Sequence, residues 1–508
     1  MAHWCFDCKK YPTQEEVDNI CKEKQHDVDV EDVFTPSNEE LGLPPTKFTS
    51  TKSEKVVIEK FVKGWIGDNF VESIYVDDKP YFLCNVKGEI QLAEKIKHEG
   101  ITYAPIEKND IPYEPYKFSK LYLNLLKNNP PPKEELLEKL EIKIKKYIDT
   151  NSNNRTVILI DTFLTYCQDQ IDTVHFLFVV GDTESGKSTI GHLIKNTGYR
   201  VQYQTDMNYA GIYNFYGTNE EANGTIIEDE AQDLDSNKDK IRLYKNSYTR
   251  GSKMAIVVGK DTANQKRQMY YNTFGFKVFI GENLPNDKGF KERLVILRMN
   301  TGFPEANIKR ITSEERENFN QLRNSLLFYK ILHIREQLPA IDTGLTNRDE
   351  ELFADFIKIV AGTKYEESAR NVVEQYTKER HESIHNSLES RLFELIVTPI
   401  DGKYMLVFED FWEYLTNTQD TIKGRLDKET FISHDFGKIT RYRIAQILSD
   451  KFQAKKEVIH RDKKQITAYL FNPNTLINLV EKYNISLSLD HQLYQDVPTF
   501  EGDDKNEL

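Results

Sequence analysis

The sequence is poor in cysteine and has no long apolar run, and each absence excludes a class of protein. Five cysteines among 508 residues are too few and too unevenly spread for a disulfide framework. The strongest apolar run, residues 174–180, is too short to span a bilayer. The first residues lack the basic flank and apolar core of a signal peptide. We therefore expect an intracellular, cytoplasmic protein with no membrane partner.

The sequence also lacks an excess of positive charge, because 68 Lys and Arg are outnumbered by 81 Asp and Glu, which gives a net charge of −13. This excludes a uniformly basic surface for nucleic acid, although binding depends on where charge lies rather than on its sum. The length exceeds what one ordinary core needs, so several domains are expected.

Three of the cysteines lie in the first 21 residues. Together with a histidine they follow the spacing Cys5-x2-Cys8-x12-Cys21-x4-His26. This is the ligand spacing of a small zinc finger in which one histidine is replaced by cysteine. Such zinc fingers usually carry a large apolar residue between the second and third ligands, and this sequence matches that feature only approximately. A Zn2+ site and reduced cysteines without metal both stay open.

A glycine-rich loop directly follows the apolar run 174–180, which suits a buried parallel strand. The loop and its continuation are Gly181, Asp182, Thr183, Glu184, Ser185, Gly186, Lys187, Ser188 and Thr189. Apolar residues then recur at helical spacing as far as Gly198. A GxxxxGK[ST] pattern between strand and helix predicts phosphate binding by backbone N–H groups, by Lys187 and, through Mg2+, by Ser188. The expected cofactors are ATP and Mg2+.

Downstream, residues 225–230 form a short β-branched run that ends in acids. We expect a second core strand, with Asp229 holding Mg2+ and Glu230 polarising the attacking water. The nearby Glu228, Asp233 and Asp235 are expected to be surface charges.

Two more strand-like segments follow, 276–285 and 291–297. In the first, Asn283 follows a strand, and in the second, a strand begins just after Arg293. With the stretches GDTESGKST, TIIEDE, VFIGENLP and FKERLVILRM in this order, residues 174–299 resemble AAA+ ATPases of the superfamily 3 type. These are replicative DNA helicases of viruses and plasmids, with related helicases of archaeal mobile elements.

The resemblance implies roles for two of these residues. Asn283 would be the sensor that contacts the γ-phosphate or its water. Arg293 would be the arginine finger, which acts on the ATP of a neighbouring subunit, so the resemblance also implies a ring, most often a homo-hexamer. The alternatives are a turn asparagine and a surface arginine, and Arg298 competes for the finger role.

Between the acids and Asn283 lies a basic segment, residues 249–268. It resembles the inserted hairpin that touches DNA phosphates in the pore of such helicases. Lys260, Lys266 and Arg267 are the expected contacts. A solvated tip with incidental charge is the alternative, because phosphate contacts carry no sharper signature.

Near the C-terminus, residues 439–448 have helical spacing after a threonine cap, two strand-like segments follow at 455–460 and 465–471, and a last helix starts at Pro473. This order resembles a winged helix-turn-helix domain. From Lys438 to Gln465 there are nine Lys or Arg against three Asp or Glu, which favours DNA. The expected contacts are Arg441, Arg443, Arg461, Lys463 and Lys464. Protein docking is the alternative.

We therefore predict a multidomain α/β protein. Its parts are a zinc-binding segment at 1–30, an N-terminal α+β module at 50–127, an AAA+ P-loop ATPase at 133–311, a helical linker or lid at 312–389, a winged-helix domain at 390–484 and an acidic tail at 485–508.

The leading hypothesis is a ring-forming, ATP-driven DNA helicase or translocase, acting on single-stranded or forked DNA with replication proteins as further partners. The alternative is an ATP-dependent switch or loader that binds DNA or a replication partner without unwinding. A scaffold with a degenerate motor is disfavoured, since Lys187, Ser188, Asp229 and Glu230 are all present.

Overall fold

The computed structural model describes residues 57–217, 224–260, 266–385, 387–397, 404–417, 422–433, 436–461, 463–483 and 485. The chain is a mixed α/β protein with several sheets and forms two compact units, Met1–Val373 and Glu374–Leu508. The predicted zinc ligands Cys5, Cys8, Cys21 and His26 lie outside the described residues, as does the tail except for Ile485. No described helix has both the length and the apolar character needed to cross a bilayer.

The first unit opens with a module of short strands. They are β1 Val57–Phe61, β2 Lys63–Ile66, β3 Asn69–Val76, β4 Lys79–Val86, β5 Glu89–Ala93, β6 Ile96–His98, β7 Ile101–Pro105 and β8 Lys117–Phe118. One sheet has the order β2-β3-β4-β5 with β8 paired to β3, and the other has the order β1-β7-β6. Strands β3 and β4 form a hairpin, and Asp77 and Asp78 turn it with positive φ. Ile66, Val71 and Phe82 lie in its core.

Three helices, α2 Lys120–Asn128, α3 Lys133–Tyr147 and α4 Ser152–Cys167, connect this module to the central sheet. Helix α3 begins after a proline run and buries Leu136, Leu137 and Leu140 on one face. Almost all of α4 is buried, so this helix lies inside the unit.

The central sheet consists of five parallel strands. They are β9 Phe176–Val180, β10 Val201–Thr205, β11 Thr225–Asp229, β14 Lys277–Gly281 and β15 Leu294–Arg298, in the order β10-β11-β14-β9-β15. The near-continuous apolar runs of β9 and β14 fit strands covered on both faces. Because the strands are parallel, all their carboxyl ends meet at one edge.

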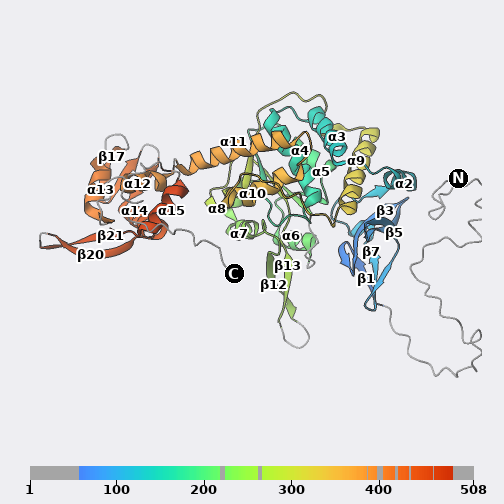
Figure 1. Cartoon of the computed structure of the whole chain (residues 1–508), viewed down its shortest axis with the longest axis horizontal. Coiled ribbons are helices and arrows are strands. Elements are labelled where there is room, and N and C mark those ends of the chain that lie inside the picture. The colour runs from blue at the N-terminus through green and yellow to red at the C-terminus, as the bar shows by residue number, and fades with distance from the viewer. Residues whose placement is uncertain are drawn as a thin grey trace, which may run out of the picture. The chain divides into compact units, whose positions relative to one another are not determined.

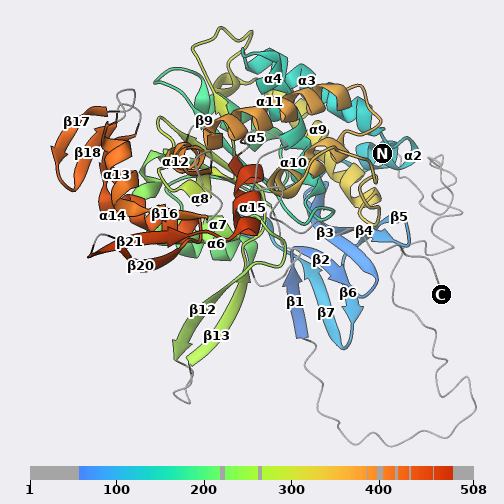
Figure 2. The ribbon, with the colours of Figure 1, turned by 60° about the vertical axis from the view of Figure 1, so that its left-hand side comes forward.

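Helices surround this sheet (Figure 2). They are α5 Lys187–Thr197, α6 Tyr209–Tyr216, α7 Lys238–Asn246, α8 Lys288–Lys291, α9 Ser313–Leu332 and α10 Asn347–Ile359. Helix α11 Glu366–His385 follows and crosses the boundary between the units. Helix α5 packs on α9 as well as on the sheet. Its end at Gly198 agrees with the sequence prediction.

A two-stranded antiparallel ribbon, β12 Lys253–Lys260 and β13 Lys266–Asn272, leaves the sheet and extends away from it (Figures 1 and 2). This is the predicted hairpin. Lys260 pairs with Lys266, and Val258 pairs with Arg267, so the predicted DNA contacts lie at its outer end.

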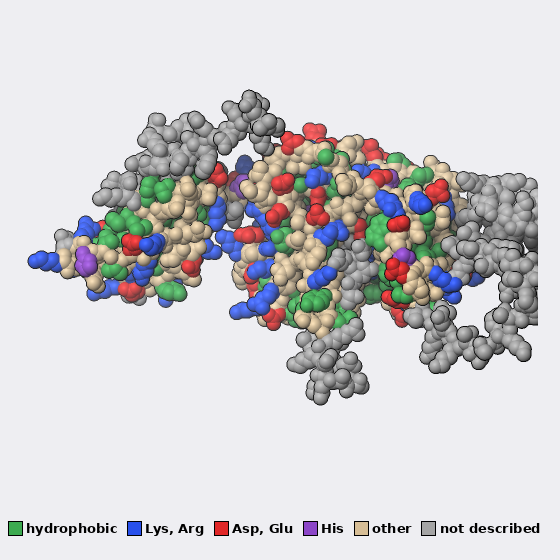
Figure 3. All heavy atoms as spheres, turned by 60° about the horizontal axis from the view of Figure 1, so that its bottom comes forward, with side chains coloured by type: hydrophobic (Ala, Val, Ile, Leu, Met, Phe, Trp, Pro, Cys, Tyr) green, Lys and Arg blue, Asp and Glu red, His purple; other side chains and the backbone are tan. Residues whose placement is uncertain are grey.

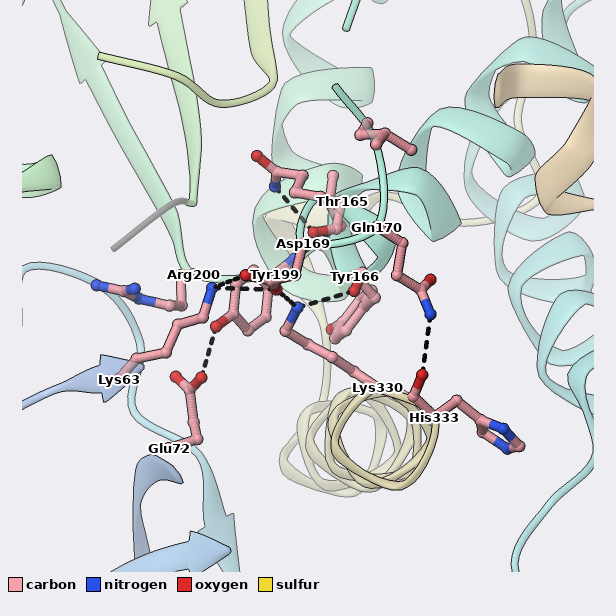
Figure 4. A network of polar contacts seen from close by, with 12 residues as sticks. Lys63, Glu72, Thr165, Tyr166, Asp169, Gln170, Tyr199, Arg200, Lys330 and His333 are labelled. Carbon is pink, nitrogen blue, oxygen red and sulfur yellow. Dashed lines mark hydrogen bonds and ion pairs between the residues drawn. The ribbon is translucent and has the colours of Figure 1, made fainter. Parts of the chain in front are cut away.

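A buried polar cluster joins the N-terminal module to the central sheet and to α9 (Figure 4). Asp169, just after α4, accepts from Nζ of Lys63 at 2.8 Å and from Nζ of Lys330. Tyr199, which follows α5, donates to Oε2 of Glu72 at 2.5 Å. Lys63 and Glu72 are each at most 1% exposed. The module and the sheet therefore share one interior.

The second unit contains α12 Leu388–Val397, β16 Met405–Val407, α13 Phe408–Asn417, β17 Ile422–Asp427, β18 Thr430–Ser433, β19 Gly437–Thr440, α14 Arg441–Gln446, β20 Lys455–Arg461, β21 Lys464–Leu470 and α15 Pro473–Tyr483. One sheet has the order β16-β21-β20 and the other β17-β18-β19. The helix predicted from Ile439 begins only at Arg441, because Ile439 and Thr440 pair with β18. Thr440 is its cap, as predicted.

Candidate functional site

The loop from Gly181 to Gly186 joins the carboxyl end of β9 to α5, and its glycines fix its path. A Cβ atom on Gly181 would lie 2.4 Å from the carbonyl oxygen of Met299 and 2.7 Å from Oγ of Ser185. Gly186 precedes α5 with φ +86°, in the left-handed region that favours glycine. The loop thus ends at a helix amino terminus, where free N–H groups and the helix dipole attract anions.

Two polar side chains indicate that this loop binds a phosphate group. Nζ of Lys187 donates to the carbonyl oxygens of Gly181 and Asp182, the latter at 2.6 Å. This places the ammonium group against the loop itself. Ser185 is 3% exposed, and its Oγ has no hydrogen-bond partner among the described residues. A buried hydroxyl without a partner is costly, and a phosphate oxygen would satisfy it.

Asp229 ends β11 and is held by a tyrosine that the sequence gave no reason to single out. Tyr203 on β10 donates its hydroxyl to Oδ2 of Asp229 at 2.5 Å. Burial and this hydrogen bond raise the pKa of Tyr203, and a hydrogen bond with Ser188 opposes them. The two predicted Mg2+ ligands, Ser188 and Asp229, therefore contact the same hydroxyl group.

Glu230 follows with φ +59°, and its backbone N–H donates to Oδ1 of Asp229 at 3.1 Å. Its side chain is exposed at the edge where the strands end. A glutamate with a left-handed backbone conformation is uncommon, and such residues are typical of turns at functional sites.

The expectation that Glu228 is a surface charge is wrong. Glu228 is 2% exposed, forms an ion pair with Lys240, and accepts from the Tyr244 hydroxyl at 2.5 Å. Both partners lie on α7, which packs over this part of the sheet. The carboxylate therefore ties α7 to β11, one residue before Asp229. Asp235 is half-buried and accepts from Asn286.

Strand β14 lies between β11 and β9, so the residues after it lie between the loop and the acids. Gly281 pairs with Val180, the last residue of β9. Glu282 accepts from Oγ1 of Thr183 at 3.0 Å, and Asn283 is exposed one residue further on. The structure thus brings the loop, Asp229, Glu230 and Asn283 to one edge. The contact of Glu282 was not predicted.

Arg293 lies at the opposite edge. Leu294 pairs with Phe176 at the start of β9, whereas Arg298 pairs with Val180 at its end. Since β9 has five residues, Arg293 lies ~15 Å from its own loop. Its guanidinium stacks 4.4 Å from the Tyr248 ring centroid and donates to the carbonyl oxygen of Gly289. Arg298 lies instead beside the loop of its own chain.

The residues at this edge fit Mg2+ bound together with a nucleotide. Within the residues that the structure describes, no group of three or more His, Cys, Asp or Glu could hold a metal ion. Mg2+ usually takes only one or two protein ligands alongside phosphate oxygens. Ser188 and Asp229 would be those ligands.

The predicted DNA contacts of the second unit lie in two places, on α14 and on the β20–β21 ribbon. The guanidinium of Arg441 stacks on Phe408 and Trp412, at 5.2 and 5.5 Å, and pairs with Glu409. The exposed Arg443 lies two residues further along α14.

The ribbon β20–β21 carries the remaining cations. Lys463, with φ +65°, and Lys464 are exposed near its tip, where Lys and Arg side chains gather (Figure 3). Arg461 is exposed beside them and pairs with Asp410 at 2.5 Å. The tip therefore presents cations to solvent, whereas Arg441 is engaged within the unit.

No protein-family model and no curated protein matches this chain. Solved structures that match include two apo forms of the NrS-1 C-terminal region. The first is 12% identical, covers 79% of this chain and 97% of its own, and has a TM-score of 0.34. The second is 11% identical, covers 79% and 96%, and has a TM-score of 0.32.

Proposed function

We propose that this protein is an ATP-dependent DNA helicase or translocase, built on an AAA+ P-loop ATPase of the superfamily 3 type. One observation carries the proposal. Three adjacent strands, β9, β14 and β11, deliver Lys187, Asn283 and the pair Asp229–Glu230 to the same edge. Phosphoryl transfer needs positioning and charge neutralisation more than covalent chemistry, and these residues supply both.

Each side chain has a task in hydrolysis. The loop and Lys187 hold the β- and γ-phosphates. Ser188 and Asp229 would hold Mg2+, which would neutralise phosphate charge. Glu230 orients the attacking water, and Asn283 lies where the terminal phosphate would end. Tyr203 holds the Asp229 carboxylate in place.

The position of Arg293 supports a ring assembly. Because this residue is ~15 Å from its own loop, it can assist only the ATP of another copy. A head-to-tail interface between copies closes into a ring, for which we propose a homo-hexamer.

Two surfaces support DNA as the substrate. The β12–β13 ribbon carries Lys260, Lys266 and Arg267 at its outer end. In the second unit, α14 followed by the β20–β21 ribbon has the order of a winged helix, with Arg443, Lys463 and Lys464 exposed. We propose that both contact the phosphate backbone. Zinc binding by the N-terminal cysteines stays a prediction.

The test is unwinding of a forked duplex by the full chain, together with ATP hydrolysis in the presence and absence of single-stranded DNA. We expect unwinding, stimulated hydrolysis, and loss of both in Lys187→Ala with an unchanged melting temperature. Normal turnover in Lys187→Ala would overturn the ATPase assignment. Hydrolysis without unwinding on either tail polarity would support the switch or loader instead.

A further inference from the structure

A second arginine lies beside Arg293 at the edge away from the loop. Arg348, near the start of α10, places its guanidinium 4.7 Å from the Tyr248 ring centroid, and Arg293 lies 4.4 Å from the same centroid. The start of α10 is fixed there because Oγ1 of Thr173 donates to the carbonyl oxygen of Glu351 at 2.5 Å. Two guanidinium groups from distant segments thus share one aromatic ring.

Both arginines keep a buried donor without a partner. Among the described residues, Nε of Arg293 and Nη2 of Arg348 have no hydrogen-bond acceptor. Burial and the nearby charge of Arg348 lower the pKa of Arg293, although Tyr248 opposes them. Glu351 pairs with Arg348 but not with Arg293. Both side chains nevertheless stay half-buried rather than fully buried, so two like charges lie side by side where an incoming anion can reach them.

We propose that Arg348 acts with Arg293 as a second phosphate-binding residue in trans, and that the pair binds the terminal phosphates of ATP held by another copy of this chain. The inference rests on the proposed function. Planar guanidinium groups bind phosphate oxygens in pairs. The loop of the same chain is ~15 Å away, so the ligand must come from a second copy.

The competing explanation is structural, because Arg348 also joins α10 to the sheet through Tyr248. Mixing separates the two explanations. The Lys187→Ala variant lacks a working ATP site of its own but keeps both arginines. The Arg348→Ala variant keeps the ATP site but lacks Arg348. Alone, Arg348→Ala should hydrolyse ATP about 100-fold more slowly than wild type, less than the ~10³-fold or greater loss expected for a primary arginine finger.

In an equimolar mixture, about one quarter of the interfaces of a head-to-tail ring would join an intact loop to an intact Arg348. Hydrolysis should therefore recover to roughly that fraction of the wild-type rate. Arg335→Ala is the matched control, since Arg335 also stacks on an aromatic ring, that of Trp65, at 4.8 Å, and it should hydrolyse ATP normally.

Recovery in the mixture supports the proposal, and wild-type rates in Arg348→Ala overturn it. So does a loss that mixing fails to restore. Should Arg348→Ala melt early, Arg348→Lys keeps the charge on Tyr248 but lacks the planar fork, and the same mixing experiment applies to it. Absence of hydrolysis in wild-type protein would instead remove the proposed function itself.

Discussion

At the scale of single residues, the hydroxyl of Tyr203 has the largest consequence for the candidate site. It donates to Asp229, and Ser188 is hydrogen-bonded to it. Its ring also stacks on His192 of α5, with 5.0 Å between centroids. A residue that orients metal ligands tunes metal affinity without binding the metal.

Tyr203→Phe keeps the ring and removes the hydroxyl. We expect the Mg2+ concentration that gives half-maximal ATP hydrolysis to rise about 10-fold, because the Asp229 carboxylate loses its orienting donor. The melting temperature should change little. Titration of hydrolysis with Mg2+ measures this, with Tyr213→Phe as a control. Equal Mg2+ dependence in both variants would contradict the role given to Tyr203.

Arg441 and Arg443 are close neighbours on α14, but Arg441 is paired within the unit whereas Arg443 is exposed. Arg443→Ala should weaken DNA binding and reduce the salt dependence by about one phosphate contact. Arg441→Ala should lower stability by about 1–3 kcal/mol, since Glu409 loses its partner and two rings lose their cation. Fluorescence anisotropy at several salt concentrations and thermal melting test this pair. A larger loss of DNA binding in Arg441→Ala would reverse the assignment.

Sequence patterns predicted those features of the fold and the site that depend only on residues close together along the chain. The strand, loop and helix around Lys187 were predictable because one local pattern specifies all three. Glu228 was not, since its buried state depends on Lys240 and Tyr244, which reach it only when α7 packs on the sheet. Tyr203 and Arg348 left no sequence signal, because strand order brings Tyr203 to Asp229 and the packing of the start of α10 brings Arg348 to the ring that Arg293 also contacts.

At the scale of elements, one carboxylate ties α3 to α9. Glu315, in the first turn of α9, accepts from Nζ of Lys143 at 2.7 Å and from the Tyr147 hydroxyl at 2.8 Å. Burial opposes its ionisation, but the hydrogen bonds from Lys143 and Tyr147 outweigh burial and lower its pKa to about 2. The Thr312 side chain caps the helix at the Glu315 N–H.

Glu315→Gln should lower the free energy of unfolding by about 1–3 kcal/mol at pH 7. A depressed carboxyl pKa stabilises the folded chain above pH 4.5, and the benefit is lost as pH falls toward 2. The difference from wild type should therefore shrink over that window. Urea unfolding at several pH values measures it. Glu314→Gln, an exposed neighbour in the same helical turn, should have little effect at any pH.

At the scale of the whole molecule, the division near Val373 separates the candidate ATP site from the proposed winged helix. The second unit has its own core, which includes Phe393, Phe452 and Tyr483 with ring centroids 5.4 and 5.7 Å from Phe393. Each unit can therefore lose stability by itself.

Phe393→Ala removes a fully buried ring and should destabilise the second unit by about 3–5 kcal/mol. Calorimetry should then show one transition moved to lower temperature and another unchanged. ATP hydrolysis without DNA should stay normal, whereas DNA binding weakens. Phe163→Ala, in the first unit, should produce the reverse pattern. A single transition that shifts as a whole would mean that the units unfold together.

The buried cluster around Asp169 limits how this protein can be shortened. A chain that starts at α3 would keep the candidate ATP site complete, yet it would remove Lys63 from Asp169 and Glu72 from Tyr199. An interior surface of charges and tyrosine rings would then face water without the strands that cover it. Attempts to express a minimal ATPase should therefore begin ahead of β1, and fusions that exchange the N-terminal strands for another domain would have to rebuild this contact.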